Sequence, residues 1–184
     1  MKLKVNFIRK ISKVAKINEI VFIKSKKVKN INLKPVLDNE LFKEQLIIQK
    51  EYSNKNKIFV NCIKTSLSTD YENIGSILLD YLRKNKIEKS FIDVDKNNIN
   101  KIHFERILHG AKLKSYSFDI YKSNNKKNKT IELNVLGKEV TKSTIFRKKL
   151  DALLEGVFFT RDLVSEPGNI LHPDEYAKRL IKLK

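Results

Sequence analysis

Few residues of this chain have the type and spacing that catalysis or metal binding requires. His103 and His109 are six positions apart, so on a helix they lie on different faces and cannot hold one metal ion as an i, i+4 pair does. Cys62 is the only cysteine and lies within the apolar run 58–63, which excludes an intrachain disulfide and indicates a small buried side chain. No serine stands in a G-x-S-x-G context. These residues indicate packing rather than chemistry.

A second candidate is the acidic run that begins at Asp93 and Asp95. It resembles the opening of a calcium-binding loop, but Asn98 occupies the position that needs glycine, and Phe104 occupies the position of the bidentate glutamate. We therefore interpret the run as the solvated end of a strand. Asn97 or Asn98 is expected to cap the helix that follows.

Phosphate-binding motifs are also missing from the sequence. Every glycine is isolated, so neither a dinucleotide-binding fingerprint nor a P-loop can be written. The sequence therefore predicts no catalytic residue, no cofactor-binding residue and no metal ligand in this chain. The five glycines are Gly75, Gly110, Gly137, Gly156 and Gly168.

Length and composition fit one globular domain with an appended segment. The chain has 184 residues, of which 41% are hydrophobic, enough to build a core. No apolar run approaches the roughly 20 residues that span a bilayer, and charges interrupt the basic N-terminus, so no secretory signal is predicted. We expect a cytoplasmic protein with no membrane partner.

The charge balance raises the possibility of a nucleic-acid partner. The formal net charge is +18, from 39 Lys and Arg against 21 Asp and Glu, and such a field attracts phosphate backbones. Only six of the basic residues are arginine, and lysine lacks the planar fork that reads bases and phosphates. A solvated basic surface is favoured, with at most weak and non-specific nucleic-acid binding.

Apolar periodicity predicts strands that alternate with helices, and hence an α/β fold with a mixed sheet flanked by helices on both faces. Asp70 is expected to cap the second helix, and Ile77 and Ile102 are expected to face the core. The polar stretch 123–129 predicts a mobile loop. Strands are expected at 2–8, 20–23, 58–63, 91–94 and 130–136, and helices at 37–47, 70–82, 98–115, 141–166 and from His172-Pro173 onward.

The most informative stretch is residues 155–177, EGVFFTRDLVSEPGNILHPDEYA. It resembles the segment that opens the catalytic half of the leucyl aminopeptidases, with the pattern A-R-D-L-V-N-E-P-P-N-x-x-T-P-x-x-F/Y-A. Residues 104–122 resemble an upstream stretch of the same family, E-G-x-x-L-x-x-Y-x-F-D-x-Y-K. The positions that match the first pattern in register are Arg161, Asp162, Leu163, Val164, Glu166, Pro167, Asn169, Pro173, Tyr176 and Ala177.

The resemblance implies a division of the chain. Residues 1–141 are expected to form the macro-like N-terminal α/β domain of these enzymes, residues 142–166 a long connecting helix, and residues 167–184 the start of the metallopeptidase domain. Gly168 stands where the family has proline, and His172 where it has threonine. Because histidine caps a helix less well, by about 0.5–1 kcal/mol, the last helix is expected to start loosely.

The resemblance also implies a function. A full-length relative is a two-metal aminopeptidase that uses manganese or zinc to remove N-terminal residues from peptides, and it assembles as a homo-hexamer. The family's metal ligands and its catalytic lysine and arginine lie further toward the C-terminus than Lys184. This chain alone is therefore expected to be inactive, to bind no metal, and to need the catalytic domain as its partner.

Two alternatives remain open: a nucleic-acid-binding module, and an inactive assembly or interaction domain. An exposed apolar stripe on the long helix would favour the interaction domain. Clustering of two groups of lysines on one face would favour the nucleic-acid module. These lysines are Lys24, Lys26, Lys27 and Lys29, and Lys122, Lys126, Lys127 and Lys129.

Overall fold

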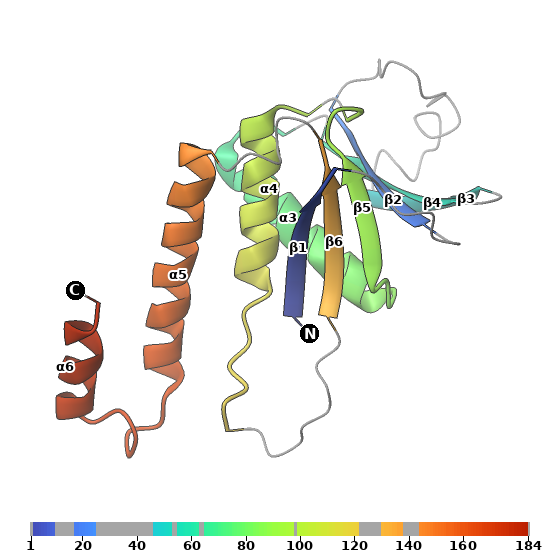
Figure 1. Ribbon diagram of the computed structural model, residues 1–184. Helices are drawn as coiled ribbons and strands as arrows, with labels where there is room; N and C mark the ends of the chain where they lie inside the picture. Colours follow the sequence, from blue (N-terminus) through green and yellow to red (C-terminus); the bar gives the residue numbers. More distant parts are fainter. Residues whose placement is uncertain are drawn as a thin grey trace.

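The chain forms an α/β fold on one six-stranded mixed sheet (Figure 1). The structure is a computed structural model that describes residues 2–9, 17–24, 46–52, 55–62, 65–97, 99–121, 130–137 and 144–183. The elements in chain order are β1 (Lys2–Ile8), β2 (Ile17–Ile23), β3 (Ile47–Tyr52), β4 (Lys55–Asn61), α3 (Ser68–Lys84), β5 (Lys89–Asp93), α4 (Lys101–Lys114), β6 (Thr130–Leu136), α5 (Ile145–Ser165) and α6 (Pro173–Ile181).

The strand order in the sheet is β1-β6-β5-β2-β4-β3. All neighbouring strands run parallel except the edge strand β3, which is antiparallel to β4. Parallel neighbours need crossover connections, and α3 and α4 supply those from β4 to β5 and from β5 to β6. The pairing of β2 with β5 is short, with only Asn18 opposite Ser90 and Glu19 opposite Phe91. The predicted mixed sheet with helices is confirmed.

One face of the sheet carries the main hydrophobic core. In β6, Ile131 and Leu133 are buried while Glu132 between them is partly exposed, the alternation of a strand with one covered face. The buried sides of α3 and α4 belong to the same core, where the rings of Phe22 and Phe104 meet edge to face with centres 6.3 Å apart. The core therefore lies between the sheet and these two helices.

The opposite face of the sheet changes character along its width. At β2 and β4 it carries the buried side chains of Val21, Ile23 and Phe59. At β1 and β6 it is polar, and the side chain of Asn6 donates to that of Asn134 at 3.1 Å. The prediction that helices also cover this second face stays a prediction, because α3 and α4 both pack on the first.

Two glycines allow α3 and α4 to cross at close range. A Cβ atom on Gly75 would lie 1.9 Å from the backbone oxygen of Ile107, and one on Gly110 would lie 1.9 Å from the backbone oxygen of Glu72. Both contacts involve backbone atoms, so no side-chain rotation could relieve them. Gly156 in α5 is different, because nothing lies within 4 Å of its Cβ position.

Most predicted elements are confirmed, and one is not. The strands predicted at 2–8 and 130–136 have those bounds, and the other three strands are present with shifted ends. The helix predicted at 37–47 is wrong at its end, because Ile47 begins β3 and its buried side chain opposes β4. Residues 37–45 of that segment, and the loop predicted at 123–129, lie outside the described residues.

The predicted helix caps need correction. Leu67 is the N-cap of α3, so Asp70 is the third helical residue; its carboxylate accepts the backbone N–H of Leu67 at 2.9 Å. α4 is capped by Asn100, whose side chain accepts the backbone N–H of Ile102 at 2.8 Å. The side chain of Asn97 instead accepts a hydrogen bond from the backbone N–H of Phe22 in β2. Acidic and amide side chains occur at several positions around a helix start, so sequence alone does not separate these roles.

Two residues predicted to face the core are largely exposed. Ile77 is 46% exposed and Ile102 is 54% exposed. Each lies at the margin of an apolar stripe whose centre packs on the sheet, and a helix covered on one side only leaves such margins in solvent. Ile107 and Ala111 of the same α4 stripe are buried as predicted.

Candidate docking interface

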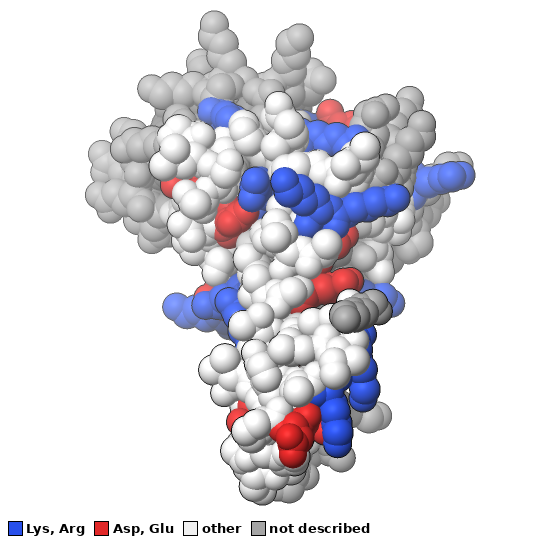
Figure 2. All heavy atoms as spheres, turned by 90° about the vertical axis from the view of Figure 1, so that its left-hand side faces the viewer, with Lys and Arg blue, Asp and Glu red and all other residues white. Residues whose placement is uncertain are grey.

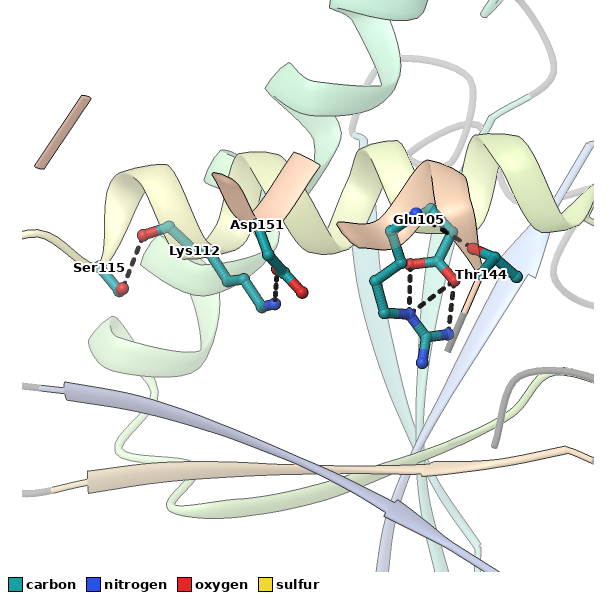
Figure 3. A network of polar contacts seen from close by, with 6 residues as sticks. Glu105, Lys112, Ser115, Thr144 and Asp151 are labelled. Carbon is teal, nitrogen blue, oxygen red and sulfur yellow. Dashed lines mark hydrogen bonds and ion pairs between the residues drawn. The ribbon is translucent and has the colours of Figure 1, made fainter. Parts of the chain in front are cut away.

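The long helix α5 is attached to α4 by a buried ion pair near its first turn. Thr144 caps α5, with its hydroxyl accepting the backbone N–H of Arg147 at 3.0 Å. The Arg147 guanidinium then pairs with Glu105 of α4, with Nε 2.9 Å from each carboxylate oxygen, and it lies 4.0 Å from the ring centre of Phe7 in β1. Only 8% and 2% of the two charged side chains are exposed. Glu105 and Thr144 are seen together in Figure 3.

A second ion pair follows one turn further along α5. Lys112 of α4 and Asp151 of α5 point toward each other (Figure 3), with Nζ and Oδ1 2.6 Å apart. Both side chains are partly exposed, so the pair adds at most roughly 1 kcal/mol. Its main effect is to fix the register of α5 on α4. Ser115 ends α4 by donating its hydroxyl to the Lys112 carbonyl at 2.6 Å.

The segment after α4 continues the attachment. The Tyr116 ring lies 5.2 Å from the Phe158 ring, and its hydroxyl donates to Asp162 at 2.9 Å. Arg161 donates to the carbonyl of Leu113 at 3.2 Å, with its guanidinium 5.4 Å from the centre of the Tyr116 ring. Because Leu113 is in the last turn of α4, Arg161 satisfies a carbonyl that the helix end leaves without an intrahelical partner.

Glu166 fixes the turn between α5 and α6. One carboxylate oxygen accepts the hydroxyl of Tyr121 and the other accepts the guanidinium of Arg179 in α6, at 3.0 Å. The hydrogen bond from Tyr121, followed by that from Arg179, holds the pKa of Glu166 below its ordinary value, and the same bond raises the pKa of Tyr121. α6 is thereby tied both to α5 and to the segment after α4.

These contacts join the two stretches that carry the family resemblance. Tyr116 and Tyr121 belong to the upstream stretch, and Asp162 and Glu166 belong to the downstream one. We call the whole set of contacts between α4 or residues 115–121 and α5 or α6 the clasp. In this chain the matching residues hold helices together.

A different face of α5 is open. Leu153, Val157 and Val164 are separated by four and seven residues, which places them on one side of a helix, and they are 51%, 36% and 81% exposed. No residue of α6 is buried, and its Tyr176 and Leu180 are 44% and 39% exposed. In Figure 2, which views the molecule from the α5–α6 end, uncharged surface makes up most of the narrow lower part, with a few blue and red side chains on it. We call the exposed apolar residues Leu153, Val157 and Val164 of α5, with Tyr176 and Leu180 of α6, the open face.

The open face includes an exposed apolar stripe on the long helix, which is the feature expected of an interaction domain. Several exposed apolar side chains on one side of a helix are typical of a site that packs against a partner. Whether the two lysine groups cluster on one face, as a nucleic-acid-binding module requires, is not tested. Of these lysines, only Lys24 lies in the described part of the chain.

Cys62, His109 and Asp93 lie at different elements of the fold. Cys62 is fully buried at the end of β4, as its apolar surroundings predicted, and burial raises the pKa of its thiol to about 12. His109 is buried, and burial lowers its pKa. Asp93 closes the turn after β5 by pairing with Lys96 at 2.9 Å. Within the described ranges, no three His, Cys, Asp or Glu side chains gather where they could hold a metal ion.

Comparison with known proteins agrees with the sequence resemblance. No family model matches the chain. A probable cytosol aminopeptidase of Gluconobacter oxydans is 36% identical over 77 residues, which are 41% of this chain and 16% of that protein. One of Treponema denticola is 35% identical over 102 residues, which are 53% of this chain and 21% of that protein. The structure of a tomato leucine aminopeptidase mutant aligns over 98% of this chain with a TM-score of 0.64 and 17% identity.

The chain is a relative of the leucyl aminopeptidases. It spans 42% of the tomato structure, and the matched region is about a fifth or less of the two curated aminopeptidases. The bottromycin maturation enzyme BotP shares the fold, with a TM-score of 0.62 and 15% identity over 90% of this chain and 36% of its own. Among the described helices, none is long and apolar enough to cross a membrane.

The family resemblance did not reveal how α5 is attached. Glu105 lies in the upstream stretch of the leucyl aminopeptidase pattern, but nothing in its neighbourhood marks it as buried. Arg147 gives a weak signal, since it stands three residues after a threonine that can cap the helix. Their pairing joins residues 42 positions apart, which neither helical periodicity nor a local motif can predict.

Proposed function

We propose that this chain is the N-terminal portion of a two-metal leucyl aminopeptidase that removes N-terminal residues from peptides. In this proposal residues 1–141 are the N-terminal α/β domain, residues 142–166 the connecting helix and residues 167–184 the start of the metallopeptidase domain. The chain contributes the docking surface for the catalytic domain and does not hydrolyse peptides by itself. The family likeness and the open face of α5 and α6 support this role.

The asymmetry of α5 carries the proposal. Along one side, the clasp fixes the helix to α4 through a buried ion pair and a series of polar contacts. Along another side, the helix presents Leu153, Val157 and Val164 to solvent. Exposed apolar side chains on a firmly held helix are stabilised when a partner removes them from water, by about 25 cal/mol per Å². The similarity to leucyl aminopeptidases indicates that this partner is the catalytic domain.

The metals of the proposal belong to the catalytic domain. BotP has been solved in complex with Mn, and two manganese or zinc ions are proposed for the full-length enzyme. The residues described here do not fit such a site, because no cluster of suitable ligands occurs among them. When bound, two such ions activate a water molecule and polarise the scissile carbonyl. The residues of this chain act by position only: the clasp orients α5 and α6 for docking.

The remaining properties of the proposal follow from the family. They are a homo-hexamer of the full-length protein, peptides as substrates, and a cytoplasmic location. An interaction domain with another partner is the alternative that the open face also supports, and it differs only in what covers that face.

Complementation with a catalytic half tests the proposal. This chain would be co-expressed with the C-terminal part of the Treponema denticola relative, with complex formation measured by size exclusion and activity by manganese-dependent release of leucine from leucine amide. We expect a complex, and activity only when both parts and the metal are present. Val164→Glu should weaken complex formation at least about tenfold, because it places a charge in an apolar interface.

A matched control separates docking from folding. Ala152→Glu introduces the same residue at another exposed position of α5, away from the open face, and should leave the complex intact. Val164 is 81% exposed, so neither variant should unfold the chain. Equal behaviour of the two variants, or no complex with the unmodified chain, would contradict the proposed docking surface.

A further inference from the structure

Three side chains from different elements meet beyond the end of β2. Lys24 follows β2, while Tyr71 and His103 lie near the starts of α3 and α4. The Lys24 ammonium donates to the Tyr71 hydroxyl and lies 3.2 Å from Nδ1 of His103. The Tyr71 and His103 rings stack, with centres 4.0 Å apart and planes at 9°. These contacts hold the lysine in one place, whereas a surface lysine is free to move.

The contacts define the donors that the cluster presents. An ammonium group can only donate, so Nδ1 of His103 must accept and the imidazole proton must lie on Nε2. Burial and the charge of Lys24 lower the pKa of His103, which keeps the ring neutral near pH 7. Lys24 has three N–H donors, and the two contacts use two of them. In the described part of the chain, one ammonium N–H and the Nε2–H of His103 are thus left for a further acceptor.

Among the described residues, no carboxylate pairs with the positive charge of the cluster. Within the residues that the structure describes, Lys24 forms hydrogen bonds only with the two neutral groups. The first turn of α4, which contains His103, has no acidic residue. Cations are unfavourable at this end of a helix, because its dipole is positive there. A bound anion would offset this concentration of positive charge.

The cluster also lies at a distinctive point of the sheet. From β5 the chain continues to β6 on one side of the sheet, and from β2 it continues to β3 on the other side. The direction in which the chain moves across the sheet therefore reverses between β2 and β5. In open α/β sheets, ligands bind beyond the carboxyl ends of the strands at such a reversal. Lys24 immediately follows the carboxyl end of β2.

We propose that Lys24, Tyr71 and His103 form a binding site for the phosphate group of a small molecule. Lys24 supplies the charge and one hydrogen bond, and His103 donates a second hydrogen bond from Nε2. Tyr71 positions Lys24 through its hydroxyl, which in turn donates to the carbonyl of Thr65 at 3.4 Å. The positive end of the α4 dipole, beside His103, favours a phosphate group as the bound anion. The site is independent of the clasp and of docking.

The test follows the imidazole signals of His103 by NMR during titration with inorganic phosphate. Ionic strength is held constant, because a net charge of +18 attracts any anion weakly. We expect saturable shifts at His103 and none at His172. Lys24→Gln should weaken phosphate binding about tenfold or more, as expected for losing one hydrogen bond to a charged group. Lys84→Gln removes the same charge at an exposed position of α3 and should leave the affinity unchanged.

A further variant and further ligands complete the test of the proposed site. If Lys24→Gln does not fold, Tyr71→Phe removes only the hydroxyl that positions Lys24 and should also lower the affinity. Tighter binding of glycerol phosphate than of inorganic phosphate would identify an ester as the ligand, and equal binding would identify free phosphate; both support the site. Shifts that do not saturate, equal losses in Lys24→Gln and Lys84→Gln, or equal affinity for acetate would overturn it.

Discussion

Removing one partner of the buried Glu105–Arg147 pair should destabilise the chain more than any other single change in the clasp. Glu105→Gln keeps the shape of the side chain but removes the carboxylate charge that the buried Arg147 guanidinium faces. Both side chains are almost completely buried, so solvent does not screen the loss. Breaking a pair of this kind costs about 3–5 kcal/mol. The Phe7 ring beside Arg147 offsets part of this, which favours about 3 kcal/mol.

Urea unfolding followed by far-ultraviolet circular dichroism measures this loss. With a slope near 2 kcal/mol per M, a loss of about 3 kcal/mol lowers the midpoint by roughly 1.5 M. Hydrogen exchange in α5 should rise in the same variant. The double variant Glu105→Leu, Arg147→Met removes both charges and should regain most of the stability, because replacing a buried pair by apolar residues is close to neutral.

The single variants Glu105→Leu and Arg147→Met, together with their double variant, form a thermodynamic cycle. We expect a coupling energy of about 2 kcal/mol or more, as for contacting residues of one network. Losses below about 1 kcal/mol in the single variants, adding without coupling, would refute the buried pair as the anchor of α5.

Four other outcomes follow from the structure. Gly75→Ala should destabilise the fold by about 1–3 kcal/mol or more, whereas Gly156→Ala should stabilise α5 by about 0.5–1 kcal/mol, both measured by denaturant unfolding. Burial lowers the pKa of His109 below 6.5. The stability that this neutral histidine contributes is therefore complete above pH 6.5 and should be lost as the pH drops through the folded pKa. Unfolding curves at several pH values should show this dependence, and His109→Gln should flatten it. Affinity for duplex DNA, measured by fluorescence anisotropy, should collapse between low and physiological salt without sequence preference; tight sequence-selective binding would contradict this. The purified chain with excess manganese or zinc should release no leucine from leucine amide, and turnover that a chelator abolishes would contradict the assignment of catalysis to another part of the enzyme.

Elements with strong local signals were predictable from the sequence. The alternation in β1 and β6 and the proline signals at the end of α5 and the start of α6 depend on residues close in sequence, and those two strands and two helix ends formed as predicted. The start of β3 was missed because Leu46 and Ile47 extend an apolar spacing that also fits a helix. Pairing with β4 decides the conformation there, which is a tertiary effect.

The clasp could not be predicted, because it consists of contacts between residues far apart in sequence. Tyr116 and Asp162 are 46 positions apart, and each alone is an ordinary polar side chain. The family resemblance identified both stretches without giving their roles. The open face was partly predictable, since the apolar spacing along α5 continues where no described residue covers it.

The central claim is that the open face of α5 and α6 docks on a catalytic domain. Hydrogen exchange along the chain, alone and with the C-terminal part of a relative, tests it most directly. In the chain alone, residues 170–183 should be much less protected than residues 58–82, because α6 buries no side chain. With the partner, protection should appear in α6 and on the open side of α5. Equal protection of both regions in the chain alone, or no change when the partner is added, would contradict the account.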